Sequence, residues 1–223
     1  MAARCTPEET VPTRSGQLDL LREDAAELLA HDLRTPLAAI AMNVDFALSE
    51  LEPGVSPSVR GALEDCSRST RTAMTLVADM VDAMQLASGE LRPHLDAVDV
   101  QTLIAAAARA VAPEAAARSV RLVWSAEPSI VRADAGLLQR ALHRVLERAL
   151  RHARGGGSID VTLRDGSVVV RVRSADATPV AIEAGIRALA THFADAVLRA
   201  HGGAMWIESD NEGALLFCVA LPA

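Results

Sequence analysis

The 223-residue chain lacks lysine and tyrosine altogether. All 22 of its basic residues are arginine, which excludes lysine chemistry, including the phosphate-binding lysine of a P-loop. Aromatic residues make up only 2% of the chain although half of its residues are hydrophobic, so leucine, valine, isoleucine and alanine must fill the core. The length predicts one large domain or two small ones.

The charge balance and the sparse cysteines exclude further classes of protein. The net charge is −7, with no basic stripe interleaved with aromatic residues, so we expect no nucleic-acid partner. Cys5, Cys66 and Cys218 are widely separated, and the six histidines have no clustered cysteine or aspartate, so no metal site is predicted. Without an apolar run of 18 residues or a signal-peptide pattern, we expect a soluble cytoplasmic protein with no membrane contact.

The N-terminal part is expected to be a helical hairpin. Residues 1–16 are polar, contain two prolines and are interpreted as a flexible tail. Apolar residues then recur at helical spacing over 17–52 and again over 57–88, and the Pro- and Gly-containing segment 52–58 between them predicts a turn. We therefore assign 17–90 to an antiparallel pair of long helices.

Each predicted helix of the hairpin has an apolar stripe that two helices cannot enclose. A second copy of the hairpin would complete a four-helix bundle, so we expect a homodimer. The predicted stripe residues are Leu21, Ala25, Leu28, Ala39, Met42 and Phe46 on the first helix and Ala62, Cys66, Ala73, Val77, Met80 and Met84 on the second.

The C-terminal part, 98–223, has a different pattern that predicts an α+β domain, a mixed sheet with helices on one face. A helix is expected at Val100–Val111 with Asp99 as its N-cap, another at Asp134–Ala153 and a last one at about 188–200. The remaining apolar runs predict a strand at 120–126 and hairpins centred on Asp165-Gly166 and within 204–222.

A proline lies in the middle of the first predicted helix, directly after a group of polar residues, in the sequence HDLRTPL at 31–37. Positions 31 and 35 are one turn apart on one helix face, so His31 and Thr35 are neighbours. Asp32 can hold one imidazole nitrogen and make the other more nucleophilic. Pro36 frees a carbonyl one turn back and favours a bend that exposes the site.

The sequence HDLRTPL resembles the H-box of the phosphoacceptor domain of sensor histidine kinases, in which each position from His31 to Leu37 fits. The resemblance implies that His31 carries a phosphoryl group, that Asp32 is the base and that Thr35 orients water when a partner is dephosphorylated. Arg34 is the basic residue of the motif and belongs to the same candidate catalytic set. The implied partner is a response-regulator receiver domain.

The resemblance covers about 17–223 and implies that the α+β domain has the fold of the histidine kinase ATPase. The nucleotide motifs of that family are replaced here. Its two N-box asparagines, which hold Mg²⁺ and phosphates, fall on Arg144 and Arg148, and a guanidinium has no lone pair for Mg²⁺. Ser174 stands at the position of the acid that reads adenine, and Asp176 would match only after a two-residue shift.

Two further nucleotide motifs are also altered. The Gly-x-Gly stretch before the last helix reads Ala188-Leu189-Ala190, and only TPVAIEAGIR remains of the lid. Four changes at four separate motifs predict that the ATP site is lost, so no cofactor is expected.

Three functions are compatible with these patterns. The favoured one is histidine phosphotransfer between His31 and receiver aspartates in two-component signalling, with the degenerate ATP domain kept as a docking surface. The first alternative is an ATP-dependent sensor histidine kinase with a diverged nucleotide site, which would use Mg-ATP. The second is a non-catalytic scaffold that binds a kinase or a response regulator. An upstream sensor kinase is a further candidate partner in each case.

Overall fold

The structure, a computed structural model, describes residues 14–52, 54–153, 156–164, 166–173 and 189–221. The chain divides into two compact units, Met1–Val81 and Asp82–Ala223. The border falls inside the second long helix, whose last turns therefore belong to the second unit. We predicted a flexible tail at 1–16. Residues 1–13 of it lie outside the described residues, and 14–16 are helical, so the prediction is wrong for these three residues.

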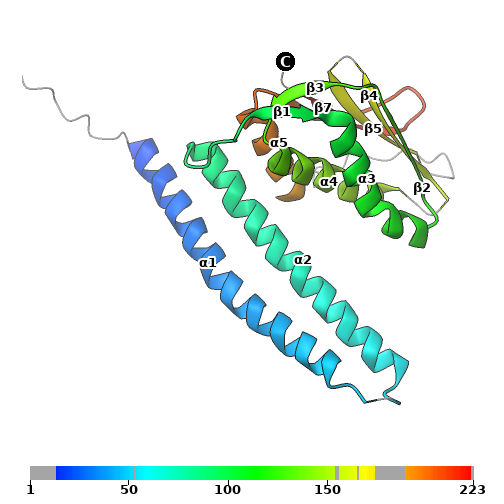
Figure 1. The fold of residues 1–223 in the computed structure, drawn as a ribbon. Helices are drawn as coiled ribbons and strands as arrows, with labels where there is room; N and C mark the ends of the chain where they lie inside the picture. Colours follow the sequence, from blue (N-terminus) through cyan, green and yellow to red (C-terminus); the bar gives the residue numbers. More distant parts are fainter. Residues whose placement is uncertain (1–13, 53, 154–155, 165, 174–188, 222–223) are drawn as a thin grey trace, which may run out of the picture. The chain divides into compact units, whose positions relative to one another are not determined.

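The first unit is a helical hairpin, as predicted (Figure 1). Helix α1 spans Arg14–Ser49 and helix α2 spans Pro57–Ser88. The turn between them contains Gly54 at a φ of +118°, a conformation that glycine adopts most readily, and Pro57 occupies the first position of α2, where its missing N–H has no consequence. Helix α1 continues through Pro36 to Ser49, so the proline does not end it.

A polar cluster joins the two helices of the hairpin. Asp45 of α1 accepts hydrogen bonds from the Ser67 hydroxyl (2.9 Å) and from the Arg71 guanidinium (2.7 Å) of α2. Ser67 is buried, whereas the Asp45 and Arg71 side chains are part-exposed. Both oxygens of the Asp45 carboxylate are thus used across the helix pair, which fixes how far α1 is shifted along α2.

The apolar stripe that we predicted for α1 is partly wrong. Met42 and Phe46 are 73% and 67% exposed, and Ala39 is exposed as well. The side that is turned inward includes Ala41 and Val44 instead, which are partly buried. The error arose because α1 has two apolar flanks, and spacing alone does not tell which of them faces α2.

The second unit contains a mixed five-stranded sheet in the order β2-β4-β5-β7-β6. Strands β2 and β4 are parallel, and the other neighbours are antiparallel. The five strands are Arg121–Ala126 (β2), Ser158–Arg164 (β4), Ser167–Arg173 (β5), Ala204–Ser209 (β6) and Leu215–Ala220 (β7). The hairpin predicted at Asp165-Gly166 is present, since Arg164 pairs with Ser167; Asp165 itself lies outside the described residues.

Three helices pack on one face of this sheet, as expected: α3 (Val100–Ala117), α4 (Ala135–His152) and α5 (Leu189–Ala200). Alternate residues of each central strand are buried under them, such as Ile159, Val170 and Phe217. The predicted N-cap Asp99 is confirmed, and Asp134, which we expected to be the first residue of its helix, is the N-cap of α4. The Asp99 carboxylate accepts the Gln101 N–H (3.0 Å) and the Asp134 carboxylate accepts the Leu137 N–H (3.0 Å).

Two features of this unit differ from the prediction. Helix α3 was expected to end at Val111, but it runs through Pro113 to Ala117, because the alanine-rich segment favours the helix and Ala115 is buried. A small antiparallel sheet of β1 (Asp96–Asp99) and β3 (Ile130–Ala133) was missed, because four-residue strands far apart in sequence carry little periodic signal.

Asp134 and His201 join three segments of the second unit. The buried imidazole of His201 accepts the Asp134 N–H at Nε2 (2.9 Å) and lies 2.7 Å from the Val197 carbonyl oxygen at Nδ1, so Nδ1 carries the proton. Asp134 Oδ2 accepts the His94 N–H (3.1 Å). Burial opposes ionisation of Asp134, but backbone donors, chiefly the N–H of Leu137, outweigh it and lower its pKa.

This arrangement predicts how acid affects the second unit. A carboxyl group with a lowered pKa in the folded state stabilises above its unfolded pKa of 3.8, and this stabilisation is lost as the pH falls through the lower folded value. Asp134→Ala should lower the free energy of unfolding at pH 7 by about 1 kcal/mol, since it removes an N-cap.

The difference between Asp134→Ala and wild type should shrink at about pH 3, as measured by urea unfolding at both pH values. Glu127→Ala, at an exposed loop position, is the control and should change neither value. An equal deficit for Asp134→Ala at both pH values would contradict this account.

Candidate functional site

The predicted catalytic residues fall together on one turn of α1. His31, Asp32, Arg34 and Thr35 all have helical backbone conformation, and Thr35 follows His31 by one turn. The side chains of Asp32, Arg34 and Thr35 are exposed, while Ala30, just before them, is fully buried. The turn therefore presents three exposed side chains directly after a buried position.

Pro36 has a simple structural effect at this turn. Because it has no N–H, the carbonyl of Asp32 has no helical donor four residues on. The helix nevertheless continues for more than three turns beyond Pro36, and the proline is itself exposed. An exposed carbonyl next to the phosphoacceptor position can be hydrated, so the missing hydrogen bond costs less here than in a buried helix.

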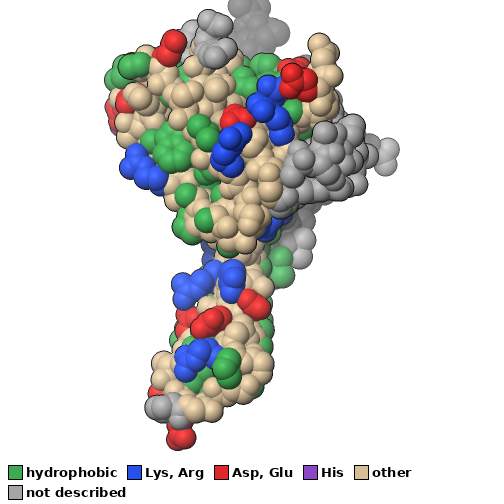
Figure 2. Space-filling model, turned by 90° about the vertical axis from the view of Figure 1, so that its right-hand side faces the viewer, with side chains coloured by type: hydrophobic (Ala, Val, Ile, Leu, Met, Phe, Trp, Pro, Cys, Tyr) green, Lys and Arg blue, Asp and Glu red, His purple; other side chains and the backbone are tan. Residues whose placement is uncertain are grey.

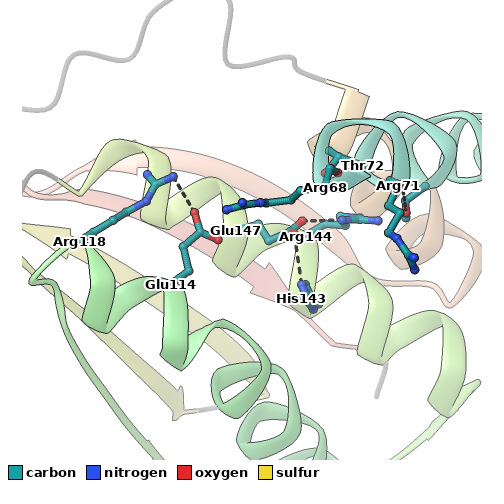
Figure 3. A network of polar contacts seen from close by, with 9 residues as sticks. Arg68, Arg71, Thr72, Glu114, Arg118, His143, Arg144 and Glu147 are labelled. Atoms are coloured by element: carbon teal, nitrogen blue, oxygen red, sulfur yellow. Dashed lines mark hydrogen bonds and ion pairs between the residues drawn. The ribbon is translucent and has the colours of Figure 1, made fainter. Parts of the chain in front are cut away.

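The positions that align with the N-box asparagines lie on α4. Arg144 is largely buried, with a side chain that is 13% exposed, and its guanidinium forms an ion pair with Glu147 one turn on (2.5 Å). His143 Nε2 lies 3.3 Å from the other oxygen of the same carboxylate. Figure 3 shows the side chains of Arg144 and His143 turned toward Glu147. It also shows a second ion pair on the neighbouring helix α3, between Glu114 and Arg118, the residue that follows the helix.

This set of side chains does not fit Mg-ATP. Mg²⁺ requires oxygen ligands, and arginine supplies only N–H donors. The Glu147 carboxylate is engaged by Arg144 and by His143. Helix α4 thus has cations, with their own counter-charge, where the family's nucleotide site has amides.

The remaining nucleotide motifs are described only in part. Ser174, Asp176, Ala188 and the short lid segment lie outside the described residues. Residues 189 and 190 begin α5 directly, so the second alanine of the altered Gly-x-Gly stretch is in regular helix. An alanine in that conformation is unstrained, whereas a glycine there would weaken the helix.

Two of the three cysteines, Cys66 and Cys218, lie in the part of the chain that the structure describes. Cys218 is buried in β7, and burial raises the pKa of its thiol to about 11, with the nearby Glu208 carboxylate acting in the same direction. Such a thiol is protonated at neutral pH and a poor nucleophile. Cys66 is an exposed free thiol on α2.

The surface carries side chains of mixed character. On the face drawn in Figure 2, basic, acidic and apolar side chains alternate on both units. Among the described residues, no three His, Cys, Asp or Glu side chains come together as metal ligands would. No helix in the described ranges is both long and apolar enough to cross a bilayer.

Comparison with known proteins bears directly on the turn that contains His31. Residues 21–89 match the model of the His Kinase A (phospho-acceptor) domain, which covers the H-box and most of both hairpin helices. This segment of the chain is therefore similar to the phospho-acceptor domain of histidine kinases. The matched range begins before His31 and ends at the glycine that follows α2.

Similar proteins are sensor kinases from several bacteria. The sensor protein KdpD of Mycobacterium tuberculosis is 32% identical over 140 residues, 60% of this chain and 16% of that protein. SphS of Synechococcus elongatus is 28% identical over 173 residues, 70% of this chain and 40% of the relative. BaeS of Escherichia coli is 28% identical over 160 residues, 71% of this chain and 33% of the relative. The chain thus spans less than half the length of each of these relatives.

Solved structures agree on the fold. Full-length ShkA, determined in complex with AMPPNP, superposes with a TM-score of 0.64 at 21% identity, over 90% of this chain and 47% of that chain. The histidine kinase AdeS of Acinetobacter baumannii gives a TM-score of 0.59 at 16% identity, over 86% and 97% of the two chains. Both superpositions extend over the helical hairpin and the α/β unit, since each covers far more than either part alone.

The contribution of the Arg144–Glu147 ion pair to stability can be tested against the exposed Arg118–Glu114 pair on the neighbouring helix. Glu147→Ala should lower the free energy of unfolding by about 1–2 kcal/mol, because it removes a charge-assisted hydrogen bond to a largely buried guanidinium. Glu114→Ala removes an exposed pair with Arg118 and should cost less than about 0.5 kcal/mol.

Urea unfolding of the two variants gives the comparison directly. If Glu147→Ala and Glu114→Ala lower the free energy of unfolding equally, the ion pair on α4 stabilises the protein no more than the exposed pair does.

Proposed function

We propose that this protein relays phosphoryl groups between His31 and receiver-domain aspartates in two-component signalling, and does not take them from ATP. One contrast supports the proposal above all. The H-box is complete on an exposed turn of α1, whereas the N-box positions on α4 hold arginines, with Arg144 in an ion pair with Glu147.

The transfer step needs only groups that this chain and a receiver supply. The neutral imidazole of His31 attacks the phosphorus of an aspartyl phosphate, a P–N bond forms and the P–O bond to the aspartate breaks. The receiver carboxylate leaves with the bonding electron pair. The proton on the second ring nitrogen stays there and is stabilised by Asp32, as the ring becomes more positive in the transition state. The reverse reaction returns the phosphoryl group.

We assign different roles to Asp32 and Thr35. Asp32 orients and polarises the imidazole, so it affects transfer in both directions. Thr35, one turn from His31 and exposed, is placed to orient a water molecule toward a phosphorylated receiver. Arg34, also exposed, provides a positive charge that attracts the phosphoryl group and the acidic site of a receiver.

One apolar flank of α1 is suited to a second copy of this chain. Leu33, Ile40 and Ala47 recur every seven residues, with Leu37 and Val44 between them, which is the spacing of a coiled-coil seam. Leu33 and Ile40 are 47% and 48% exposed in the single chain, while the other three are half-buried. We infer that the homodimer forms along this flank and completes a four-helix bundle.

The other apolar flank lies in line with the phosphoacceptor. Positions 31, 35, 42 and 46 fall on one helix face by their spacing, and Met42 and Phe46 are among the most exposed large apolar side chains of the described residues. A receiver that reaches His31 would cover this flank, which makes it the docking surface.

The alternative function is an ATP-dependent histidine kinase, which the similarity to sensor kinases favours. Mg-ATP binding distinguishes the two. Under our proposal, about 1 mM Mg-ATP should not raise the melting temperature or give saturable heat in calorimetry. A ligand at 100 times its dissociation constant would stabilise the fold by about 2.7 kcal/mol, which either measurement detects. A clear rise in melting temperature would support the kinase.

Variants at the H-box test the transfer itself. With a receiver phosphorylated by an acyl phosphate, the label should reach this protein as acid-labile, alkali-stable phosphohistidine, and His31→Ala should abolish it. Asp32→Asn should slow the transfer about 10²–10⁴-fold without changing the melting temperature. Thr35→Ala should keep the transfer but lose phosphatase activity on the receiver. Labelling that persists in His31→Ala would refute the assignment.

A matched pair of variants tests the two flanks of α1. Ile40→Glu should give the monomer mass in light scattering, because a buried unpaired charge in the seam costs several kcal/mol. Phe46→Glu should remain dimeric but take label from the receiver more slowly, since it alters the docking flank only. If Phe46→Glu dissociates the dimer and Ile40→Glu does not, the assignment of the two flanks is reversed.

A further inference from the structure

The last two turns of α2 belong to the α/β unit. Ala83 and Leu86 of α2 are 1% and 8% exposed and are members of the same buried cluster as the side chains of α3, α4 and the sheet. Leu91, just after the helix, packs against this cluster, and its N–H returns to the Gln85 carbonyl (2.9 Å). The helix end is thus a packed part of this unit.

One ion pair adds a specific link to this packing. Asp82 Oδ2 lies 2.7 Å from Arg140 Nη1 of α4, and the two side chains are 26% and 42% exposed. The guanidinium carbon of Arg140 also lies 4.7 Å from the centroid of the Phe193 ring, and Phe193 is fully buried in α5. A single arginine therefore joins the end of α2 to both α4 and α5, through a charge pair and a cation–π contact.

Helix α2 is continuous from Pro57 to Ser88, and Gly89, at a φ of +80°, ends it. With Arg140 in place, the segment 82–88 cannot fray from the α/β unit without exposing Ala83 and Leu86 and separating two charges. Without that contact, it would be the end of a long helix, and helix ends fray readily.

We propose that Asp82, Arg140 and Phe193 form a latch that fixes the α/β unit to the end of α2. The role that we give this latch rests on the proposed function. A kinase has to bring bound ATP to the phosphoacceptor histidine, which requires a mobile attachment. A docking scaffold has no such requirement, so a helix end that is fixed within its own unit is compatible with this function.

Amide hydrogen exchange on the unphosphorylated protein, without any receiver, tests the latch. Asp82→Asn keeps the size of the side chain and removes its charge, and the amides of 82–91 should exchange about threefold to tenfold faster. Arg140→Met removes the ion pair and the cation–π contact together and should accelerate exchange in the same segment at least as much. Arg151→Met, at an exposed position of α4, is the matched control and should leave exchange unchanged.

Two results would overturn the latch. Exchange in 82–91 at the wild-type rate in both Asp82→Asn and Arg140→Met would show that the packing of Ala83 and Leu86 is sufficient alone. Acceleration spread evenly over α3, α4 and α5 would indicate general destabilisation rather than local release. Because the experiment involves no phosphate, its failure leaves the role of His31 untouched, and the failure of phosphotransfer leaves the latch untouched.

Discussion

The packing of α4 is the constraint on which the second unit depends. One side of this helix is an unbroken apolar surface between the sheet and the neighbouring helices, and its members are at most 8% exposed: Leu137, Leu138, Ala141, Leu142, Val145, Leu146, Ala149 and Leu150. Burial on this scale fixes the rotation of the helix about its axis. The positions left on the other side, including 140, 144 and 148, are therefore available for polar chemistry whatever residue occupies them.

In the function that we propose, this separation lets the fold persist without nucleotide chemistry. Asparagine-to-arginine replacement at Arg144 changes the polar side of α4 and leaves the apolar side intact. The new cation has a counter-charge in Glu147 on the same helix, so no bound ligand is needed to balance it. The same side also supplies Arg140, which pairs with Asp82 and stacks on Phe193. Polar positions of α4 thus serve contacts within the protein.

In the function that we propose, the hairpin separates two tasks along two flanks of a single helix. The seven-residue recurrence that includes Leu33 and Ile40 favours a second copy, and the exposed Met42 and Phe46 follow the phosphoacceptor position. The Asp45 carboxylate, bonded to two side chains of α2, fixes the alignment of α1 with α2 and so determines which residues of α2 stand beside each flank.

Periodicity and capping signals predicted most of the fold. The two long helices, the cap at Asp99 and the hairpin at Gly166 follow from local sequence, and the structure confirms them. The rotation of α1 was not predictable in the same way, because Met42 and Phe46 are as apolar as Leu33 and Ile40. The β1–β3 pair and the ion pair between α2 and α4 join residues 30 or more positions apart, which no local pattern encodes.

The sequence predicted the motif of the candidate site but not the contacts of its side chains. HDLRTPL predicts the phosphoacceptor turn, and the arginines at 144 and 148 predict that the amide ligands are missing. The pairing of Arg144 with Glu147 was not foreseen, since an i, i+3 pair on a helix rich in arginine has several possible partners.

We propose that phosphate enters through a receiver and not through ATP, and a paired labelling experiment distinguishes the two routes. The purified protein is incubated with radiolabelled Mg-ATP in one reaction and with a radiolabelled phospho-receiver in the other, and His31→Ala is the control in both. We expect label on wild-type protein only in the second reaction, and none on the variant. Label on His31 from Mg-ATP alone would contradict this proposal.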